Sequence, residues 1–403
     1  MIILLSSFTK KFINIWNDGN HNRHHTNTIE NHHVTPFPWG RELYQRIKLF
    51  PWWIKYNFGL TEESELKDKI IHLAIEMNLE KRWIKKIVRH AVSEFSKKGL
   101  GQDYYGYHNI NHELEATYFT LLSANSHVGR SNGNNNTFTN KDIKYLFVSA
   151  LFHDYDPAKQ FDKPNEESIE WFLRNDSKIR KLIDILGIDI NIVIAIIYRT
   201  AYPFKGEIAE NAIKRIQELV SVVDQVKEKD DNDCNNIDNV NYISKRIEHY
   251  QRLGWFLSVC ERIAGYALGN GEHTNKLAIS NAHSLGWHPA MINEESVKYF
   301  DALKQEDEML QFVLKGIPDN LRKNFFNNVE YFQNYYKKEK KIRNLVINGE
   351  IIFVCKVEGI KNSRNNGKSS FIDLEIRNRV LNIYNKLPIP LKVGERDFYI
   401  FTF

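Results

Sequence analysis

Two histidine-containing segments, each attached to an apolar run of helical spacing, constrain this chain more than any other feature. The first reads Tyr-His-Asn-Ile-Asn-His and ends at His112, and apolar residues follow it at roughly helical intervals. The second is residues 143–152, a nearly all-apolar run that predicts a buried helix and leads directly into His153 and Asp154. This pattern favours a mainly α-helical fold in which two helices bring polar side chains to one place.

The side chains that these helices carry are typical of a metal site. His108 and His112 are four residues apart, which on a helix would place both imidazoles on one face near the helix start. Neutral imidazole suits transition metals, while a carboxylate such as Asp154 has two oxygens and can bridge two divalent ions. A His-Asp pair alone is a weak signal in a chain with 15 histidines, but the two segments together predict a metal site.

The order Tyr-His-Asn-x-x-His, followed by His-Asp-x-Asp, resembles the HD superfamily of metal-dependent phosphohydrolases. Within that superfamily it is most similar to the catalytic domains of class I cyclic nucleotide phosphodiesterases. The resemblance covers roughly residues 100–310 and implies an all-helical domain with two divalent ions, Zn²⁺, Mg²⁺ or Mn²⁺. By position, it makes His108 the general acid and His112, His153 and Asp154 metal ligands.

Two positions depart from the family pattern. After His-Asp-x-Asp the family usually continues His-Pro-Gly, whereas this chain reads Asp-Pro-Ala-Lys from Asp156. Where the family has its late metal-binding Asp, the equivalent segment here has Cys260 and Glu261. Glu261 is the expected fourth ligand, because a long helical pattern leads into it, although its extra methylene moves the carboxylate by about one bond length. Asp224 is the alternative fourth ligand.

The implied ligand set predicts hydrolysis of a phosphate ester, with a 3',5'-cyclic nucleotide as the expected substrate. Two ions bridged by Asp154 and a water would lower the pKa of that water, so that hydroxide attacks phosphorus near neutral pH. An imidazolium at His108 would protonate the departing alcohol oxygen. The same residues also suit a nucleotidase or deoxynucleotide phosphohydrolase, or a degenerate HD module that binds nucleotide or metal without turnover.

Four further residues are candidates for supporting or substrate-binding roles. Glu166 and Glu167 could orient metal-bound waters, although an ordinary acidic first helical turn explains them equally well. Tyr198 and Arg199 close an apolar helix with a cation and an aromatic ring. That combination suits a phosphate and a stacked base, and it also suits an ordinary helix C-terminus.

Composition limits the class of protein. The chain has 403 residues, 42% of them hydrophobic, which is enough for a large core and more than one domain. The formal net charge of +5 is small for this length, so we expect a small-molecule nucleotide rather than nucleic acid as partner. Three cysteines without paired spacing favour a reducing compartment. No stretch approaches a membrane span, so a cytoplasmic protein is expected, and a homodimer is compatible with the sequence.

The hydrophobic pattern divides the chain into three parts. We expect residues 1–60 to be a flexible, histidine-rich and aromatic segment that docks on the core. Residues 61–343 are expected to form the helical phosphohydrolase domain. Residues 344–403 change character and predict a small α/β domain. Its expected elements are a strand or hairpin over 345–357, a helix over 371–385 and a strand over 397–403.

Overall fold

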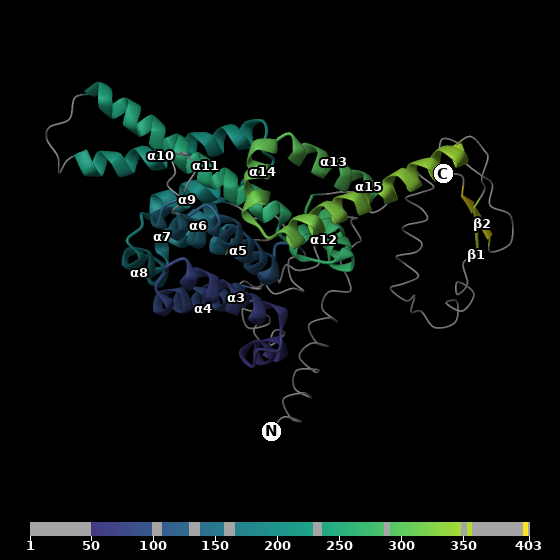
Figure 1. Ribbon diagram of the computed structural model, residues 1–403, viewed down its shortest axis with the longest axis horizontal. Helices are drawn as coiled ribbons and strands as arrows, with labels where there is room; N and C mark the ends of the chain where they lie inside the picture. Colours follow the sequence, from purple (N-terminus) through teal and green to yellow (C-terminus); the bar gives the residue numbers. More distant parts are fainter. Residues whose placement is uncertain are drawn as a thin grey trace, which may run out of the picture. The chain divides into compact units, whose positions relative to one another are not determined.

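The computed structural model describes residues 50–98, 107–128, 138–156, 166–228, 236–285, 291–347, 353–356 and 398–401. These residues are mainly α-helical, as the sequence predicts (Figure 1). They fall into two compact units. The first is Met1–Leu285 with Glu306–Phe325, and the second is Gly286–Gln305 with Phe326–Phe403, each as far as it is described.

Helix α5 (Ile110–Asn125) is central to the first unit, because α3, α6, α11 and α14 all pack against it. Helices α6, α9 and α11 also contact one another, and α10 packs along α9 and α11. The described helices of this unit are α3 (Glu62–Glu76), α4 (Lys81–Lys98), α5, α6 (Asn140–Phe152), α7 (Glu166–Asn175), α8 (Ser177–Leu186), α9 (Ile190–Tyr198), α10 (Glu207–Glu228), α11 (Asn236–Leu268), α12 (Gly271–Ser284), α14 (Asp307–Gly316) and the start of α15 (Asp319–Ile347).

The apolar content of each helix matches its depth in this unit. Helix α9 is apolar on all sides, and every residue from 192 to 198 is buried. Helix α8 has one apolar face, which it buries through Ile179, Leu182 and Leu186, and it ends at Gly187 in the left-handed conformation with φ of 66°. Each fully buried aliphatic side chain stabilises the fold by about 1.5–3 kcal/mol.

Helix α14 approaches α5 closely at a glycine. A Cβ atom added at Gly316 would lie 2.2 Å from the carbonyl oxygen of Ser123. Two serine hydroxyl groups at the end of α5 stabilise this close approach. Ser123 donates a hydrogen bond to the Val313 carbonyl oxygen at 2.8 Å, and Ser126, the C-cap of α5, donates one to the Gly316 carbonyl oxygen at 2.5 Å. These contacts join segments far apart in the sequence and hold the end of α5 in place.

The second unit contains α13 (Ile292–Lys304), the end of α15, and the strands β1 (Phe353–Lys356) and β2 (Phe398–Phe401). The strands pair antiparallel with Phe353 opposite Phe401, so both predicted strand regions contain a strand. The predicted start at residue 345 is wrong, because α15 continues to Ile347. The predicted helix over 371–385 lies outside the described residues, and the proposed domain boundaries stay predictions.

The N-terminal aromatic segment is described only from residue 50. The rings of Trp52 and Trp53 stack on Tyr56, with centroids 5.1 and 5.5 Å from that ring. Docking of the remaining aromatic residues lies outside the described part of the chain. No helix among the described residues is both long enough and apolar enough to cross a membrane.

Candidate metal centre

The first histidine segment forms the start of α5. Asn109 is the N-cap of this helix, and its side-chain oxygen accepts hydrogen bonds from the backbone N–H groups of Asn111 at 2.9 Å and His112 at 3.1 Å. His112 is thereby fixed in the first turn. His108 precedes the cap, so a turn, and not the one-face helical spacing expected from the sequence, sets its position relative to His112.

The second histidine segment forms the end of α6. A reciprocal capping box between Thr139 and Asp142 starts this helix, and residues 145–152 are all buried, as their apolar pattern predicts. His153 is the C-cap and keeps a helical backbone, with φ of −62° and ψ of −33°. Asp154 follows it directly, so both polar side chains emerge at the same buried helix end.

The side chains of His112, His153 and Asp154 converge in the first unit. The Nε2 atoms of His112 and His153 lie 3.1 and 3.2 Å from Asp154 Oδ2, and one ligand atom from each residue lies within 4.8 Å of the others. His108 Nε2 is farther from the same oxygen, at 3.9 Å. The histidine side chains also differ in exposure: 3% for His112, 1% for His153 and 15% for His108.

This arrangement fits a divalent metal ion. In the described part of the chain, the buried Nε2 atoms of His112 and His153 make no hydrogen bond of acceptable geometry. A buried polar atom without a partner costs about 1–3 kcal/mol, so such atoms mark a site that another group completes. Ligand atoms bound to one tetrahedral ion at about 2.0–2.1 Å lie about 3.3 Å apart. The spacings of 3.1 and 3.2 Å to Asp154 Oδ2 are close to that value.

Glu113, which is not among the residues predicted from the sequence, contacts both His153 and Asp154. Its carboxylate is 1% exposed; Oε1 accepts a hydrogen bond from the backbone N–H of Asp154 at 3.1 Å, and Oε2 lies 3.0 Å from His153 Nδ1. The available signal was its place beside His112 in a buried helical turn. A carboxylate behind a metal-ligating imidazole fixes the orientation of that ring.

The surroundings of His153 select its tautomer. The two groups close to its Nδ1 are the Ala150 carbonyl oxygen, at 2.9 Å, and Glu113 Oε2, and both can only accept when Glu113 is ionised. Nδ1 must therefore carry a proton and donate to the Ala150 carbonyl. In the neutral ring this leaves the lone pair on Nε2, which is the atom that faces His112 and Asp154.

The charges in the cluster are strongly coupled. Burial raises the pKa of Asp154, but the charge of His153 and the neighbouring imidazoles of His108 and His112 outweigh burial and hold that pKa well below its usual value. Burial lowers the pKa of His112, so this ring is neutral, as a metal ligand requires. Burial also raises the pKa of Glu113 to about 6, although the His153 charge opposes the rise. Asp154 is thus ionised and His112 neutral near neutral pH.

Neither residue predicted as the fourth metal ligand, Glu261 or Asp224, belongs to the converging group of His112, His153 and Asp154. Glu261 lies on α11, where burial raises the pKa of its carboxyl to about 8, with His153 opposing and Asp154 adding to the rise. The carboxyl group of Glu261 therefore interacts electrostatically with His153 and Asp154. Among the described residues, however, only His112, His153 and Asp154 bring ligand atoms within 4.8 Å of one another. Asp224 belongs to α10, and its side chain lies outside the described part. Both assignments stay predictions.

The remaining predicted residues lie on α7 and α9. Glu166 and Glu167 form the acidic first turn of α7, and neither belongs to the convergent cluster. The hydroxyl of Tyr198 donates to Glu170 Oε2 at 2.9 Å, so this tyrosine joins α9 to α7. A substrate role for these three residues stays a prediction, as it does for Arg199, the C-cap of α9.

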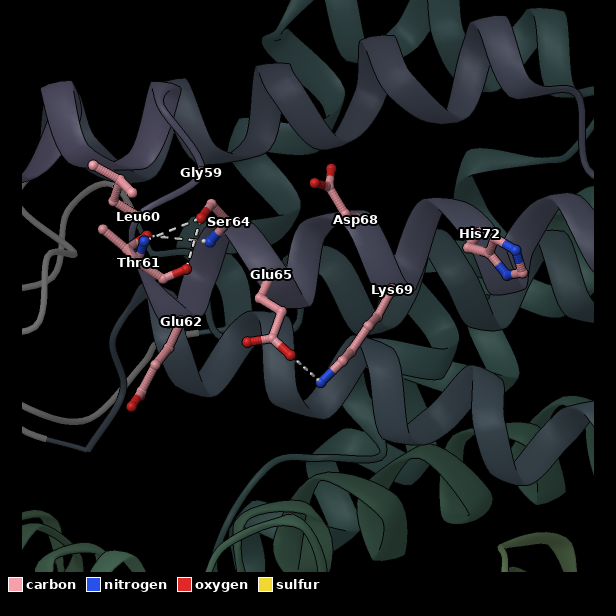
Figure 2. A pocket seen from close by; sticks show the side chains of 9 residues that line it. All are labelled: Gly59, Leu60, Thr61, Glu62, Ser64, Glu65, Asp68, Lys69 and His72. Carbon is pink, nitrogen blue, oxygen red and sulfur yellow. Dashed lines mark hydrogen bonds and ion pairs between the residues drawn. The ribbon is translucent and has the colours of Figure 1, made fainter.

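A surface hollow runs along α3 and the turn before it, between residues 59 and 72 (Figure 2). Its lining includes the ion pair between Lys69 and Glu65, at 2.7 Å, and the exposed imidazole of His72. Both ions of the pair are largely exposed, so the pair stabilises little. None of the three converging residues lines this hollow, and it does not alter the assignment of the metal centre.

Comparisons with known proteins show a weak similarity. No protein-family model matches the sequence, and no curated protein matches it. Among solved structures, the phosphodiesterase domain of the RhoPDE fusion protein from the choanoflagellate Salpingoeca rosetta is similar over 70% of this chain and 94% of that domain. The TM-score is 0.41 and the sequence identity is 11%. A similarity at this level shows neither the family nor the activity of the chain.

Proposed function

We propose that this protein is a metal-dependent phosphohydrolase that cleaves a phosphate ester. The observation that carries the proposal is the buried meeting of His112 Nε2, His153 Nε2 and Asp154 Oδ2. Two imidazoles and one carboxylate are a ligand set typical of catalytic metal sites, which keep a coordination position for water or substrate. Structural zinc sites instead use four protein ligands, usually including cysteine, and the buried Cys260 is not part of this cluster.

Each residue of the cluster would have a different role in hydrolysis. A divalent ion held by His112, His153 and Asp154 would polarise a phosphoryl oxygen and lower the pKa of water. Glu113 holds the Asp154 backbone and the His153 ring in position, so the ligand atoms are oriented before an ion arrives. His108 is the most exposed histidine of the group and lies at its edge, where its imidazole can protonate the oxygen that leaves phosphorus.

The finer assignments concern substrate and metal count. The order Tyr-His-Asn-x-x-His and His-Asp-x-Asp favours a 3',5'-cyclic nucleotide as substrate and a second ion. Asp154 is the candidate bridge to that ion through its second carboxylate oxygen. Glu261 is the candidate fourth ligand beside His112, His153 and Asp154, and Asp224 is the alternative. Zn²⁺, Mg²⁺ and Mn²⁺ all accept imidazole or carboxylate ligands to some degree, so the identity of the ions has to be measured.

The test is hydrolysis of a panel of cyclic and linear nucleotides with Mg²⁺, Mn²⁺ or Zn²⁺. Wild type is compared with Asp154→Ala, His108→Ala and His72→Ala; His72 is an exposed histidine on α3 and serves as the control. We expect metal-dependent turnover in wild type and His72→Ala and none in Asp154→Ala. His108→Ala should lose turnover while it keeps most of the metal.

The outcomes separate the alternatives. Equal loss of metal in Asp154→Ala and His108→Ala would contradict the roles proposed for the two residues. Turnover confined to linear nucleotides would favour a nucleotidase on the same metal site. Bound metal without turnover of any nucleotide would favour a binding module and would reject the hydrolase.

A further inference from the structure

A second charged cluster lies outside the metal centre, on α9, on α11 and at the start of α14. Arg262 is 8% exposed and binds Glu306 through two hydrogen bonds, from Nη1 to Oε1 at 2.7 Å and from Nη2 to Oε2 at 2.9 Å. Trp255 donates its Nε1–H to the same Oε2 at 2.5 Å. Both oxygens of Glu306 are thereby occupied. Burial raises the pKa of Glu306, but these donors outweigh burial and lower it, so the carboxylate is ionised.

Arg199 adds a second guanidinium to this cluster. It caps α9, its side chain is half-buried, and among the described residues it has no hydrogen-bond acceptor and no ion-pair partner within 4 Å. Glu306 attracts Arg199 only at longer range, and burial together with the charge on Arg262 lowers the pKa of Arg199. Two guanidinium groups, those of Arg199 and Arg262, are thus attracted to the one carboxylate of Glu306, and only Arg262 is hydrogen-bonded to it.

The packing around Arg199 holds its side chain in this place. A Cβ atom at Gly254 would lie 2.5 Å from Arg199 Cβ and 2.9 Å from the Ile196 carbonyl oxygen, so only glycine lets the end of α9 come so near α11. The ring of Phe204 lies beside both guanidinium groups, 4.4 Å from Arg262 and 5.9 Å from Arg199. The stem of Arg199 is thus confined, and its side-chain N–H groups have no acceptor among the described residues.

We propose that Arg199 and the neighbouring Arg262 form a binding site for a phosphate group, distinct from the metal centre. A guanidinium presents up to five donors in a planar fork that matches two oxygens of a phosphate. A partly desolvated cation is costly without a counter-charge, and a bound dianion removes that cost. The ligand class is inorganic phosphate or a phosphate monoester. The site does not depend on the proposed hydrolase activity, because no residue of the metal cluster takes part.

The test is calorimetric titration of the full chain with inorganic phosphate at constant ionic strength, with EDTA present to remove divalent ions. Wild type is compared with Arg199→Gln, Arg199→Lys and Arg252→Gln. Arg252 lies on the same helix as Arg262 but is already paired with Glu308 at 2.8 Å, so its replacement removes an equal charge without removing an unpaired donor. Asp154→Ala serves as the variant without a metal centre.

We expect phosphate binding in wild type, Arg252→Gln and Asp154→Ala. Arg199→Gln should weaken it by about tenfold or more, the effect of one lost hydrogen bond between charged groups, and Arg199→Lys should weaken it less. Absence of binding in wild type, or equal affinity in Arg199→Gln and wild type, would overturn the proposal. So would loss of binding in Asp154→Ala, since phosphate would then be bound at the metal centre.

Discussion

Replacement of Glu113 by Gln changes one buried atom and tests how the metal centre is oriented. The amide oxygen can still accept the Asp154 backbone N–H, now at 3.1 Å from Oε1, but an NH₂ group then faces His153 Nδ1 across the 3.0 Å contact. Two donors cannot share that contact, so the variant favours the His153 tautomer with its proton on Nε2. That tautomer cannot bind a metal through the atom that faces His112 and Asp154.

The expected magnitude is a loss of metal affinity of about 10–100-fold, as for other carboxylates behind a ligating histidine. This corresponds to about 1.4–2.7 kcal/mol of binding free energy. The loss should be partial, because the Ala150 carbonyl still favours a proton on Nδ1. Isothermal titration of the metal-free protein with Zn²⁺ and Mn²⁺ measures it, with thermal unfolding in EDTA as the check that the fold is retained.

Glu115→Gln is the matched control. Glu115 is also buried on α5, and its Oε1 lies 3.2 Å from Nε2 of a histidine, His273, which is outside the metal cluster. Both variants therefore replace a buried glutamate of α5 by glutamine, and in both the replaced carboxylate lies beside an imidazole. We expect Glu115→Gln to bind metal as wild type does. Equal metal affinities for Glu113→Gln and wild type, or equal losses in the two variants, would refute the tautomer argument.

Three further predictions follow from local geometry. Asn109→Ala removes the cap that fixes His112, so denaturant unfolding should show a loss of about 1 kcal/mol and titration should show weaker metal binding; a loss of neither would contradict the capping role. Gly316→Ala places a methyl group against the Ser123 carbonyl, and calorimetric unfolding should show a loss of about 1–3 kcal/mol, whereas an unchanged unfolding temperature would contradict the close approach. Burial raises the pKa of Glu170, but the arginine and tyrosine side chains that donate to its carboxylate outweigh burial and lower this pKa. The ionised carboxylate therefore stabilises the fold above the unfolded-state pKa near 4.5, and this stabilisation is lost as pH falls through the lower pKa of the folded state. Wild type should therefore exceed Glu170→Gln in stability at pH 7 by more than at pH 3.5, and a difference that is the same at both pH values would contradict this.

The helices of the metal centre could be predicted because their signal is local. The nearly all-apolar run over residues 143–152 predicts a buried helix. Because His153 and Asp154 follow this run directly, they lie at its buried end however the helix packs. The prediction for the first histidine segment, that of His108 and His112, rests on weaker grounds. Helix α5 begins after its N-cap Asn109, so His108 lies outside the helix and helical spacing does not relate it to His112. An Asn followed by a helical pattern is itself the sequence signal of an N-cap.

The contacts that could not be predicted join residues far apart in the chain. Nothing in the sequence near Arg262 indicates that Glu306 will bind it, and the support that Glu113 gives to His153 depends on how α5 packs against α6. The strand predicted to start at residue 345 was wrong for a different reason, because helix α15 extends to Ile347. Residues 345–347 are apolar and β-branched in part, and the preceding helix continued through them in spite of that local preference.

The most direct test of the metal centre is anomalous diffraction from crystals of the protein grown with Zn²⁺, with data collected on both sides of the zinc absorption edge. The proposal predicts an anomalous peak about 2.0–2.2 Å from His112 Nε2, His153 Nε2 and an Asp154 carboxylate oxygen. The same peak should be absent in Asp154→Ala. Zinc bound only elsewhere, or no zinc at these three atoms at saturating concentration, would contradict the central claim.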